Sequence, residues 1–413
     1  MLHLPLRWWG RMHHARSRCL NSDLGSLLAA ITQTYMISVQ ISEGRASLEA
    51  ISPEWERLIG NTFTSTFSQP AWYLAWMDAF QTGQVAIITA REGNRLVGIL
   101  PFARSRTDAR GLYFTRVGPL AIGDYQPPIV VPEYVSIALP AMLDAAIAHF
   151  GRRGVLWWPH IPATDPSLGV LRSYFSSRRM PFVEESDVTP RLRLNGGDFA
   201  SAEQSWPSKH RVDVRRRRKL LAARGPVSLW QPSTMEEAEP VLDEFFRVHD
   251  KKWLSQGFPG RFQKSEQREH FRAMLRRLLG RGLHFSTVRC GHIDVSYYIA
   301  FLSGGWLQCY RPSYRLEFHH VSPGKIHIAL LIEEACRLRL HGIDFLLGDE
   351  PYKRLWANER LEVVDIHAGF SEWTPSYFWF ARGKPYVRQR LGLAYLRAEA
   401  WVQKWWQGDH ADH

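Results

Sequence analysis

The repeated order of secondary-structure elements constrains this 413-residue chain most. Each half shows a hairpin, a further strand, a helix and a final strand. In the first half the hairpin joins 85–90 to 95–103 across "REGN", and a helix at 137–150 precedes a strand from 155. In the second half "LHFSTVRC" and "IDVSYYIAFL" pair across "GH", and "IHIALLIEEACRLRL" leads into "IDFLL". The alternating patterns indicate an α+β (mixed α/β) chain in which one unit occurs twice.

The length of the chain fits about two domains. We expect each domain to be a mixed sheet flanked by helices. The expected segments, in chain order, are a flexible arm at 1–35, a first domain at 36–200, a basic linker helix at 201–225, a second domain at 226–382 and an amphipathic helix at 383–413.

The composition predicts a soluble, cytoplasmic protein without a metal site. Hydrophobic residues make up 45% of the chain, yet no apolar run approaches the roughly 20 residues of a membrane-spanning helix. The four cysteines are far apart in the sequence, which disfavours disulfides and structural zinc. The adjacent histidines His319 and His320 lie in an expected loop, and no HExxH motif occurs.

The net charge of +12 is concentrated in one segment, 209–224, which holds eight Lys or Arg against one acid. Such a cluster indicates a polyanionic partner, or else a solvated helix face. Because four consecutive arginines point in different directions, we expect some of them to meet acids of the same protein. The C-terminal segment combines tryptophan with basic residues, which is typical of a surface helix or of a peripheral membrane contact.

The first candidate site is the helix start "SPGK", formed by Ser322, Pro323, Gly324 and Lys325. Serine is a favoured N-cap and proline suits the first helical turn. Free N–H groups, a positive dipole end and a lysine together favour an anion, most simply a phosphate. The helix follows one strand and crosses to the next, so it begins at the carboxyl edge of the sheet, where ligands bind. The alternative is an ordinary helix start without a ligand.

The second candidate site follows the expected strand 343–347 directly. It contains two acids, a phenol and two bases, namely Asp349, Glu350, Tyr352, Lys353 and Arg354. Either acid is a candidate general base, the tyrosine a candidate proton donor, and Lys353 a candidate for stabilising negative charge. The alternative is a loop salt bridge that holds Arg354.

Both motifs together resemble the CelD-like acyltransferases, a branch of the GNAT superfamily related to Fem-type aminoacyltransferases. The resemblance rests on the Ser-Pro-Gly helix start and on Gly-Asp-Glu-x-Tyr-Lys about twenty-five residues later, and it extends from about residue 66. The fuller phosphate loop of ordinary GNAT enzymes is missing.

The resemblance implies two tandem GNAT-like domains and acyl transfer from acyl-coenzyme A to a small-molecule or saccharide acceptor in a polysaccharide or cell-envelope pathway. The helix at 322–325 would receive the coenzyme A pyrophosphate, and Asp349 or Glu350 would face the acceptor. His320 is a further candidate base. The first domain would be a scaffold or acceptor-binding wall.

Two other functions stay open at this point. A Fem-type transferase would take aminoacyl-tRNA, which segment 209–224 would contact, and such a contact weakens steeply with salt. A non-catalytic protein would bind anionic surfaces through the basic segment and the C-terminal helix. Loss of activity in Asp349→Asn or Glu350→Gln would exclude the non-catalytic alternative.

Overall fold

The computed structural model describes residues 36–60, 65–80, 83–109, 112–151 and 155–370. The expected arm at 1–35 and the whole of the expected helix at 383–413 lie outside the described residues, as does segment 371–382. Within the described part of the chain, no helix is both long enough and apolar enough to cross a membrane.

The first half contains one unit of alternating strands and helices. Its main elements are β1 (Ile37–Glu43), α2 (Gly44–Ile59), α3 (Pro70–Ala79), β2 (Gln84–Glu92), β3 (Arg95–Ala109), β4 (Leu112–Pro119), β5 (Ile129–Val130), α4 (Val135–Phe150), β6 (Val155–Pro162), α5 (Ser167–Ser177) and β7 (Phe182–Arg193). Two short 3₁₀ turns, η1 (Thr66–Ser68) and η2 (Pro132–Tyr134), precede α3 and α4.

The second half repeats this order after two connecting helices. Its elements are α6 (Phe199–Gln204), α7 (Ser208–Ala222), β8 (Val227–Trp230), α8 (Met235–Ser255), η3 (Arg261–Gln263), α9 (Ser265–Leu278), β9 (Leu283–Cys290), β10 (Ile293–Ser303), β11 (Trp306–Tyr314), η4 (Leu316–Val321), α10 (Pro323–Arg337), β12 (Gly342–Asp344), α11 (Pro351–Arg354) and β13 (Glu359–Gly369). The predicted repeat is therefore confirmed.

All strands join one sheet, in the order β1-β2-β3-β4-β6-β13-β7-β12-β11-β10-β9-β8, with β5 attached to β3. The last strand of each unit lies beyond its own unit: β13 pairs with β6 of the first half, and β7 pairs with β12 of the second. In the middle, β7 and β13 run antiparallel to each other over ten residue pairs. The two units thus complete one another.

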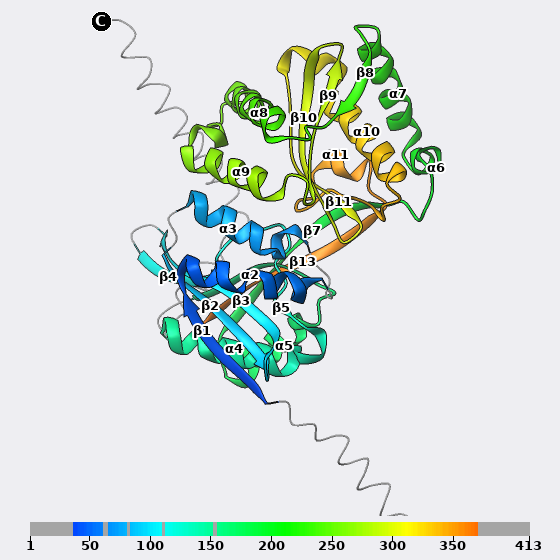
Figure 1. Ribbon diagram of the computed structural model, residues 1–413. Coiled ribbons are helices and arrows are strands. Elements are labelled where there is room, and N and C mark those ends of the chain that lie inside the picture. The colour runs from blue at the N-terminus through cyan, green and yellow to red at the C-terminus, as the bar shows by residue number, and fades with distance from the viewer. Residues whose placement is uncertain (1–35, 61–64, 81–82, 110–111, 152–154, 371–413) are drawn as a thin grey trace, which may run out of the picture.

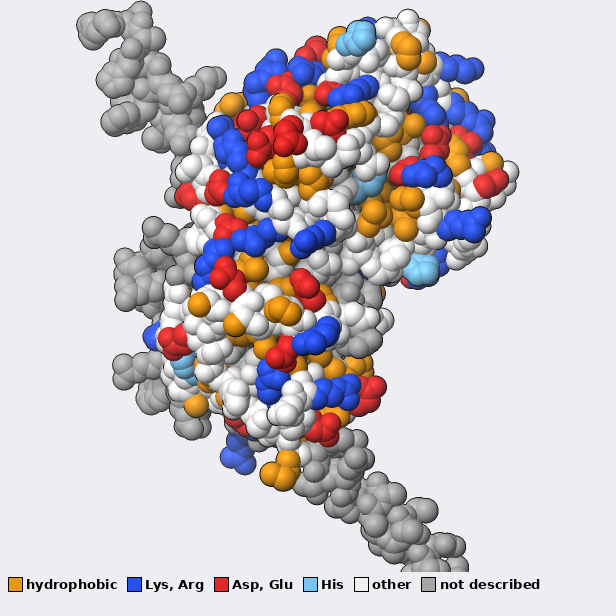
Figure 2. All heavy atoms as spheres, viewed as in Figure 1, with side chains coloured by type: hydrophobic (Ala, Val, Ile, Leu, Met, Phe, Trp, Pro, Cys, Tyr) orange, Lys and Arg blue, Asp and Glu red, His pale blue; other side chains and the backbone are white. Residues whose placement is uncertain are grey.

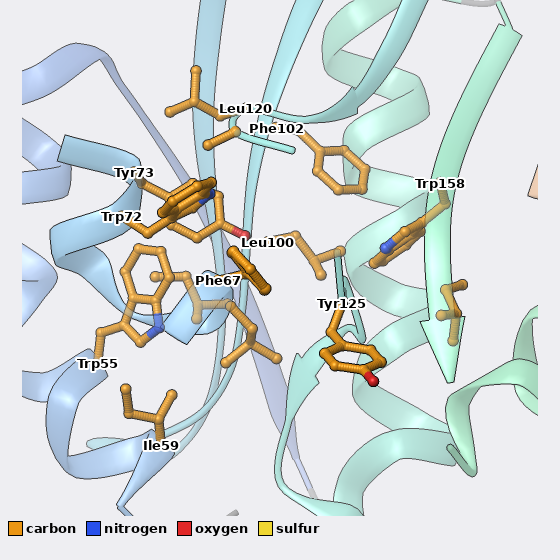
Figure 3. Packing of buried hydrophobic residues seen from close by; sticks show 14 of the residues in the cluster. Trp55, Ile59, Phe67, Trp72, Tyr73, Leu100, Phe102, Leu120, Tyr125 and Trp158 are labelled. Atoms are coloured by element: carbon orange, nitrogen blue, oxygen red, sulfur yellow. The ribbon is translucent and has the colours of Figure 1, made fainter. Parts of the chain in front are cut away.

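Helices cover both faces of each half of the sheet. In the upper part of Figure 1, α8 and α9 lie on one side of the strands, and α7 and α10 lie on the other. The helices of the first unit surround the lower strands, and α3 packs against α9 of the second unit. Aromatic side chains fill the first core, as Figure 3 shows for Trp55, Phe67, Trp72, Tyr125 and Trp158, which are all almost fully buried.

The expected strand 343–347 is shorter than predicted, because β12 ends at Asp344. Leu346 and Gly348 have φ angles of +57° and +102°, which a regular strand excludes. The backbone follows β7 instead, since the N–H groups of Phe345 and Gly348 donate to the carbonyls of Pro190 and Val188 at 3.0 Å. The residues after Asp344 lie outside the ladder with β11: Phe345 and Leu346 are buried, and Leu347 is half-buried.

A buried ion pair joins the two halves beside this point. Arg191 of β7 donates to Asp344 of β12 over 3.0 Å, and the Asp344 side chain is fully buried. The hydroxyl of Tyr125, from the first half, lies 2.8 Å from the same carboxyl oxygen, and the Leu346 N–H donates to the other oxygen. Burial raises the pKa of the Asp344 carboxyl, and the Arg191 guanidinium opposes that shift.

Candidate active site

The site begins where two parallel strands separate. β11 and β12 pair in parallel, as predicted, but only from Trp306 opposite Gly342 to Gln308 opposite Asp344. Beyond these residues β11 continues to Tyr314, whereas the chain after β12 stays with β7. A gap therefore opens at the carboxyl edge of the sheet, with the inner edge of β11 free of a neighbouring strand among the described residues. Open α/β sheets bind ligands at such edges.

A β-bulge in β11 sets which side chains face which side of the gap. The register with β10 shifts between Ile299 and Ala300, so that Tyr310 has no opposite residue. Before the bulge, Cys309 packs in the cluster that contains α10. After it, Tyr310 packs against the core of α8 and α9, and Arg311 lines a hollow beside α8. β11 therefore places a thiol on the face of α10, and a phenol and a guanidinium group on the face of α8.

Helix α10 begins at the same edge, directly after β11 and η4. Ser322 occupies the N-cap position in a left-handed conformation (φ +51°), but its side chain makes no capping hydrogen bond, contrary to expectation. Pro323 is the first helical residue. A Cβ atom added at Gly324 would meet only Tyr314, at 3.9 Å, so the first turn is open on this side. The helix start can therefore be approached closely by a ligand.

Lys325 contacts the basic helix rather than open solvent. Its ammonium group lies 2.7 Å from Asp213 of α7, and this contact, more than any other, lowers the pKa of the Asp213 carboxyl to about 2. Arg217 also contacts Asp213, and it donates to the backbone carbonyl of His320. The exposed imidazole of His320 is not part of this contact. Helix α7 thereby holds the loop before α10 in place.

The arginines of α7 pair with acids of the same protein, as predicted for part of the cluster. Arg215 pairs with Glu203 of α6, and Arg218 pairs with Glu333 of α10. Figure 2 shows the resulting surface on the side of α6 and α7, where basic and acidic side chains alternate. Much of the positive charge of segment 209–224 is therefore compensated locally.

The two acids after β12 have different partners. Asp349 contacts the guanidinium groups of Arg354, at 2.7 Å, and of Arg360. The hydrogen bond from Arg354 is the largest influence that lowers the pKa of Asp349. Asp349 thus forms the loop salt bridge that the sequence left open as an alternative. Glu350 instead lies 2.8 Å from Lys353, and its side chain is 52% exposed.

Lys353 is buried and organises the backbone of the site. Its ammonium group donates to the carbonyl oxygens of Leu346, Leu347 and Gly348 at 3.3, 2.6 and 3.1 Å. These are the residues that leave the ladder after β12. The lysine therefore stabilises the irregular backbone that keeps the gap open, while it also neutralises Glu350.

Tyr352 of α11 lies within electrostatic range of Cys309 and Arg311 of β11, and it remains 39% exposed. Burial and then the charge of Glu350 raise the pKa of its hydroxyl, so the phenol stays protonated at neutral pH. Burial raises the pKa of the Cys309 thiol to about 12, so this thiol is not ionised either. The structure thus brings Glu350, Tyr352 and β11 together.

The sequence motifs did not identify three charged residues of this region. Asp124 comes from the first half and accepts a hydrogen bond from the Leu347 N–H at 3.3 Å. Arg261 and Arg311 line a hollow on the face of α8. Arg311 is the single charged residue of strand 306–314 and was a usable signal, whereas nothing near Asp124 in the sequence indicates its position.

Two other features carry no site. Among the described residues, no group of three His, Cys, Asp or Glu side chains is arranged to hold a metal ion. A hollow of about 490 Å³ lies far from the gap, between α2 and the loops around 94 and 132. Its lining includes Glu54, Arg57, Arg95 and Glu133, whose charges balance.

We compared the chain with protein-family models, with curated protein sequences and with solved structures. Residues 208–354 match the family model described as an acetyltransferase (GNAT) domain. No curated protein sequence matches the chain. The solved structure of FemX is similar at a TM-score of 0.54 and 10% identity, covering 78% of this chain and 96% of that one.

Two further structures are similar at lower scores. A tandem GNAT protein from the clavulanic acid biosynthesis pathway has a TM-score of 0.46 and 13% identity, covering 81% of this chain and 99% of that one. L-PGS from Bacillus licheniformis has a TM-score of 0.45 and 11% identity, covering 78% and 92%. At such identities structural likeness shows the fold and not the reaction. Residues 208–354 are therefore similar to a GNAT acetyltransferase domain, and they lie within a mixed α/β fold built from two repeated units.

Proposed function

We propose that the protein is an acyl-coenzyme A-dependent N- or O-acyltransferase whose reaction takes place in the gap between β11 and residues 345–348. The observation that carries this proposal is the separation of β11 from β12 beside the open first turn of α10. The two amides of the pantetheine arm can pair with the free edge of β11 as an added strand would. The coenzyme A pyrophosphate would then lie at the positive end of α10.

Lys325 has a smaller role in this arrangement than the sequence suggested. Because Asp213 neutralises it, the helix N-terminus supplies most of the attraction for the pyrophosphate. Ser322 and Pro323 shape the turn, and Gly324 permits close approach.

Glu350 is the better general base of the two adjacent acids. Asp349 is held by two guanidinium groups, which stabilise its ionised form and weaken it as a proton acceptor. As the acceptor nitrogen or oxygen attacks the thioester carbonyl, Glu350 takes its proton. The C–S bond then breaks, and Tyr352 protonates the departing thiolate. Lys353 keeps both residues in place.

The acceptor is proposed from the resemblance to CelD-like proteins. We assign it to a small molecule or saccharide of a polysaccharide or cell-envelope pathway, with the first half as scaffold and acceptor-binding wall. Asp124 supports this role of the first half, because it contacts the backbone of the site from there.

Calorimetric titration with acetyl-coenzyme A and with longer acyl-coenzyme A species tests the donor. We expect micromolar binding that is lost in Gly324→Val. Gly169→Val is the matched control, since Gly169 is also helical and a Cβ there meets nothing within 4 Å. If the folded protein binds no acyl-coenzyme A, the donor assignment is wrong.

Activity of matched acid variants tests the base. We expect Glu350→Gln to lower kcat by about 10²–10⁴-fold, the usual contribution of a general base, and Asp349→Asn to lower it less. Equal losses in both variants would contradict the assignment. Full activity in both would favour the non-catalytic alternative.

Aminoacyl-tRNA is the second candidate donor, favoured by the similarity to FemX. Against it, Arg215, Arg217 and Arg218 of α7 already have partners within the protein. An RNA contact through many cations predicts a steep loss of affinity with salt, whereas a single pyrophosphate predicts a shallow one. The slope of log Kd against log salt distinguishes the two donors.

A further inference from the structure

A hollow of about 240 Å³ opens on the face of the sheet that carries α8, next to the gap. His249 and Trp253 of α8, Phe258, Pro259, Arg261 and Arg311 line it. It is smaller than the roughly 300–1,000 Å³ of sites that enclose drug-sized ligands, so it fits a small group. Its walls are mainly aromatic, and its two charged residues are both arginines.

Neither arginine has a carboxylate within ion-pair distance among the described residues. The Nε atom of Arg311 is buried and has no hydrogen-bond partner there. The Arg311 guanidinium lies 4.7 Å from the centroid of the Tyr310 ring. Arg261 uses its Nε atom on the neutral side chain of Gln267. Most arginines of α7 and the arginine of α11 are paired with acids, whereas these two arginines of the hollow are not.

Both arginines stay charged. Burial lowers the pKa of Arg261, but an arginine remains protonated at neutral pH despite such a shift. For Arg311 burial acts in the same direction, whereas Tyr310 and Asp124 outweigh it and raise the pKa. His249 adds no charge, since burial lowers its pKa and its Nε2 atom accepts a hydrogen bond from Trp253 at 3.1 Å. Arg261 is exposed, so the cost of holding a charge without an anion falls mainly on Arg311, whose Nε atom is buried.

The hollow is separate from the proposed donor site. It lies on the face of α8, whereas α10 packs on the opposite face with Cys309 and Tyr298. The bulge at Tyr310 turns Arg311 toward α8. An acceptor in the hollow and a thioester from the side of α10 would therefore meet across the gap, where Glu350 and Tyr352 lie.

We infer that this hollow binds an anionic group, a carboxylate or a phosphate, of the acceptor through Arg261 and Arg311. The inference rests on the proposed acyl transfer, and it narrows the acceptor to acidic amines or alcohols. The planar guanidinium groups suit either anion, because both accept paired N–H donors. Asp124, which lies near both arginines, excludes a second negative group at that side.

Direct binding of simple anions tests the inference without turnover. We propose calorimetric titration of the full chain at low salt with inorganic phosphate, with succinate, and with succinamide as the uncharged match for succinate. We expect binding of phosphate or of succinate, and none of succinamide. The anion that binds tells a phosphate acceptor from a carboxylate one.

Three variants locate the binding. Arg261→Gln and Arg311→Gln should each weaken anion binding at least tenfold, whereas Arg281→Gln, at an exposed arginine of the α9–β9 turn, should not. Arg261 is partly exposed, so its variant is informative even if Arg311→Gln does not fold. Unchanged binding in both pocket variants, or no anion binding by the folded protein, overturns the inference.

Acyl-coenzyme A titration in the same variants separates the two proposals. We expect its Kd to stay within twofold in Arg261→Gln, because the donor lies on the other face. Anion binding without any acyl-coenzyme A binding would refute the donor assignment and leave the pocket standing. Acyl-coenzyme A binding without anion binding would refute the anion pocket and leave the donor assignment standing.

Discussion

The two halves of the molecule have the same separation of parallel strands, and they use it differently. In the first half β4 and β6 pair at two positions among the described residues, Arg116 opposite Val155 and Val117 opposite Leu156. Segment 120–128 then fills the space. The side chain of Gln126 accepts a hydrogen bond from the Gly123 N–H and donates one to the Tyr73 hydroxyl over 2.6 Å. The backbone N–H of Gln126 donates to the carbonyl of His160. In the second half β11 passes directly into η4 and α10, and no comparable segment follows it.

The filled gap has become core, and the open gap has become the candidate site. Figure 3 shows Leu120 and Tyr125 of the filling segment packed among Phe67, Phe102 and Trp158. The same segment reaches across the seam, where Tyr125 contacts Asp344 and Asp124 contacts Leu347. Under the proposed function, the half with the open gap would hold the reaction and the half with the filled gap would support it.

Removal of β13 tests whether the two halves depend on their shared sheet, and we expect it to have the largest effect. A chain ending at Asn358 loses β13, which pairs with six residues of β6 and ten of β7. We expect cooperative unfolding to be lost, because two strands in the centre of the sheet become unpaired edges. Circular dichroism and urea denaturation measure this effect. A chain ending at Phe370 is the control, and an unchanged midpoint in the shorter chain would show that the halves fold independently.

The buried ion pair at the seam gives the next largest effect. Asp344→Ala leaves the Arg191 guanidinium buried without its partner, and we expect it to lower the free energy of unfolding by about 3–5 kcal/mol. The double variant Arg191→Met/Asp344→Ala should recover part of that loss. Urea denaturation checks both variants. A loss of less than about 1 kcal/mol in the single variant would mean that the seam does not depend on this pair.

Two variants, one in each gap, test whether the filled gap contributes to stability and the open gap to activity. Gln126→Ala in the filled gap should cost about 1–3 kcal/mol of unfolding free energy, since it removes buried hydrogen bonds, and should leave the Kd of acyl-coenzyme A unchanged. Glu350→Gln in the open gap should change stability by less than about 0.5 kcal/mol and abolish most turnover. Denaturation and kinetics on both proteins provide the test. The opposite pattern would reverse the roles of the two halves.

The clamp between α7 and α10 gives the smallest effect, visible only in acid. Asp213 has a folded-state pKa of about 2, below the usual value of about 4 for aspartate, so its ion pairs add stability above pH 4 that disappears as the pH falls through 2. Because both side chains are still partly exposed, we expect less than about 1 kcal/mol of stabilisation. Lys325→Met should reduce the change in the urea midpoint between pH 5 and pH 2, whereas Lys219→Met, on α7 with Asp213, should not. Equal profiles would assign no stability to the clamp.

Local patterns carried much of the prediction. Alternating apolar residues indicated the hairpins 85–103 and 283–302, and Pro323 marked the start of α10 at the carboxyl edge, because these signals depend only on near neighbours. The parallel pairing of β11 with β12 also followed from the helical crossover between them. The roles predicted for Asp349, Glu350, Tyr352, Lys353 and His320 stay predictions. Geometry now ranks Glu350 above Asp349.

Other features could not be predicted, because they join residues far apart in the chain. Asp124 reaches the site from 223 positions away. Lys353 binds the carbonyls of 346–348 only because the backbone leaves β11 there, and the apolar letters of "FLL" do not distinguish that course from a strand. The side chain of Ser322 in "SPGK" makes no capping hydrogen bond, and the left-handed conformation of its backbone was not indicated by the sequence.

The sequence by itself determined the repeated α+β order, the basic helix and the two motifs of the site, since hydrophobic periodicity and turn residues act locally. Only the tertiary structure decided that β7 and β13 complete each other's halves and that one gap is filled while the other is open. It also decided that most arginines of α7 find acids, whereas Arg261 and Arg311 do not. Pairing over long separations depends on which surfaces exclude water together, and no short stretch of sequence records that.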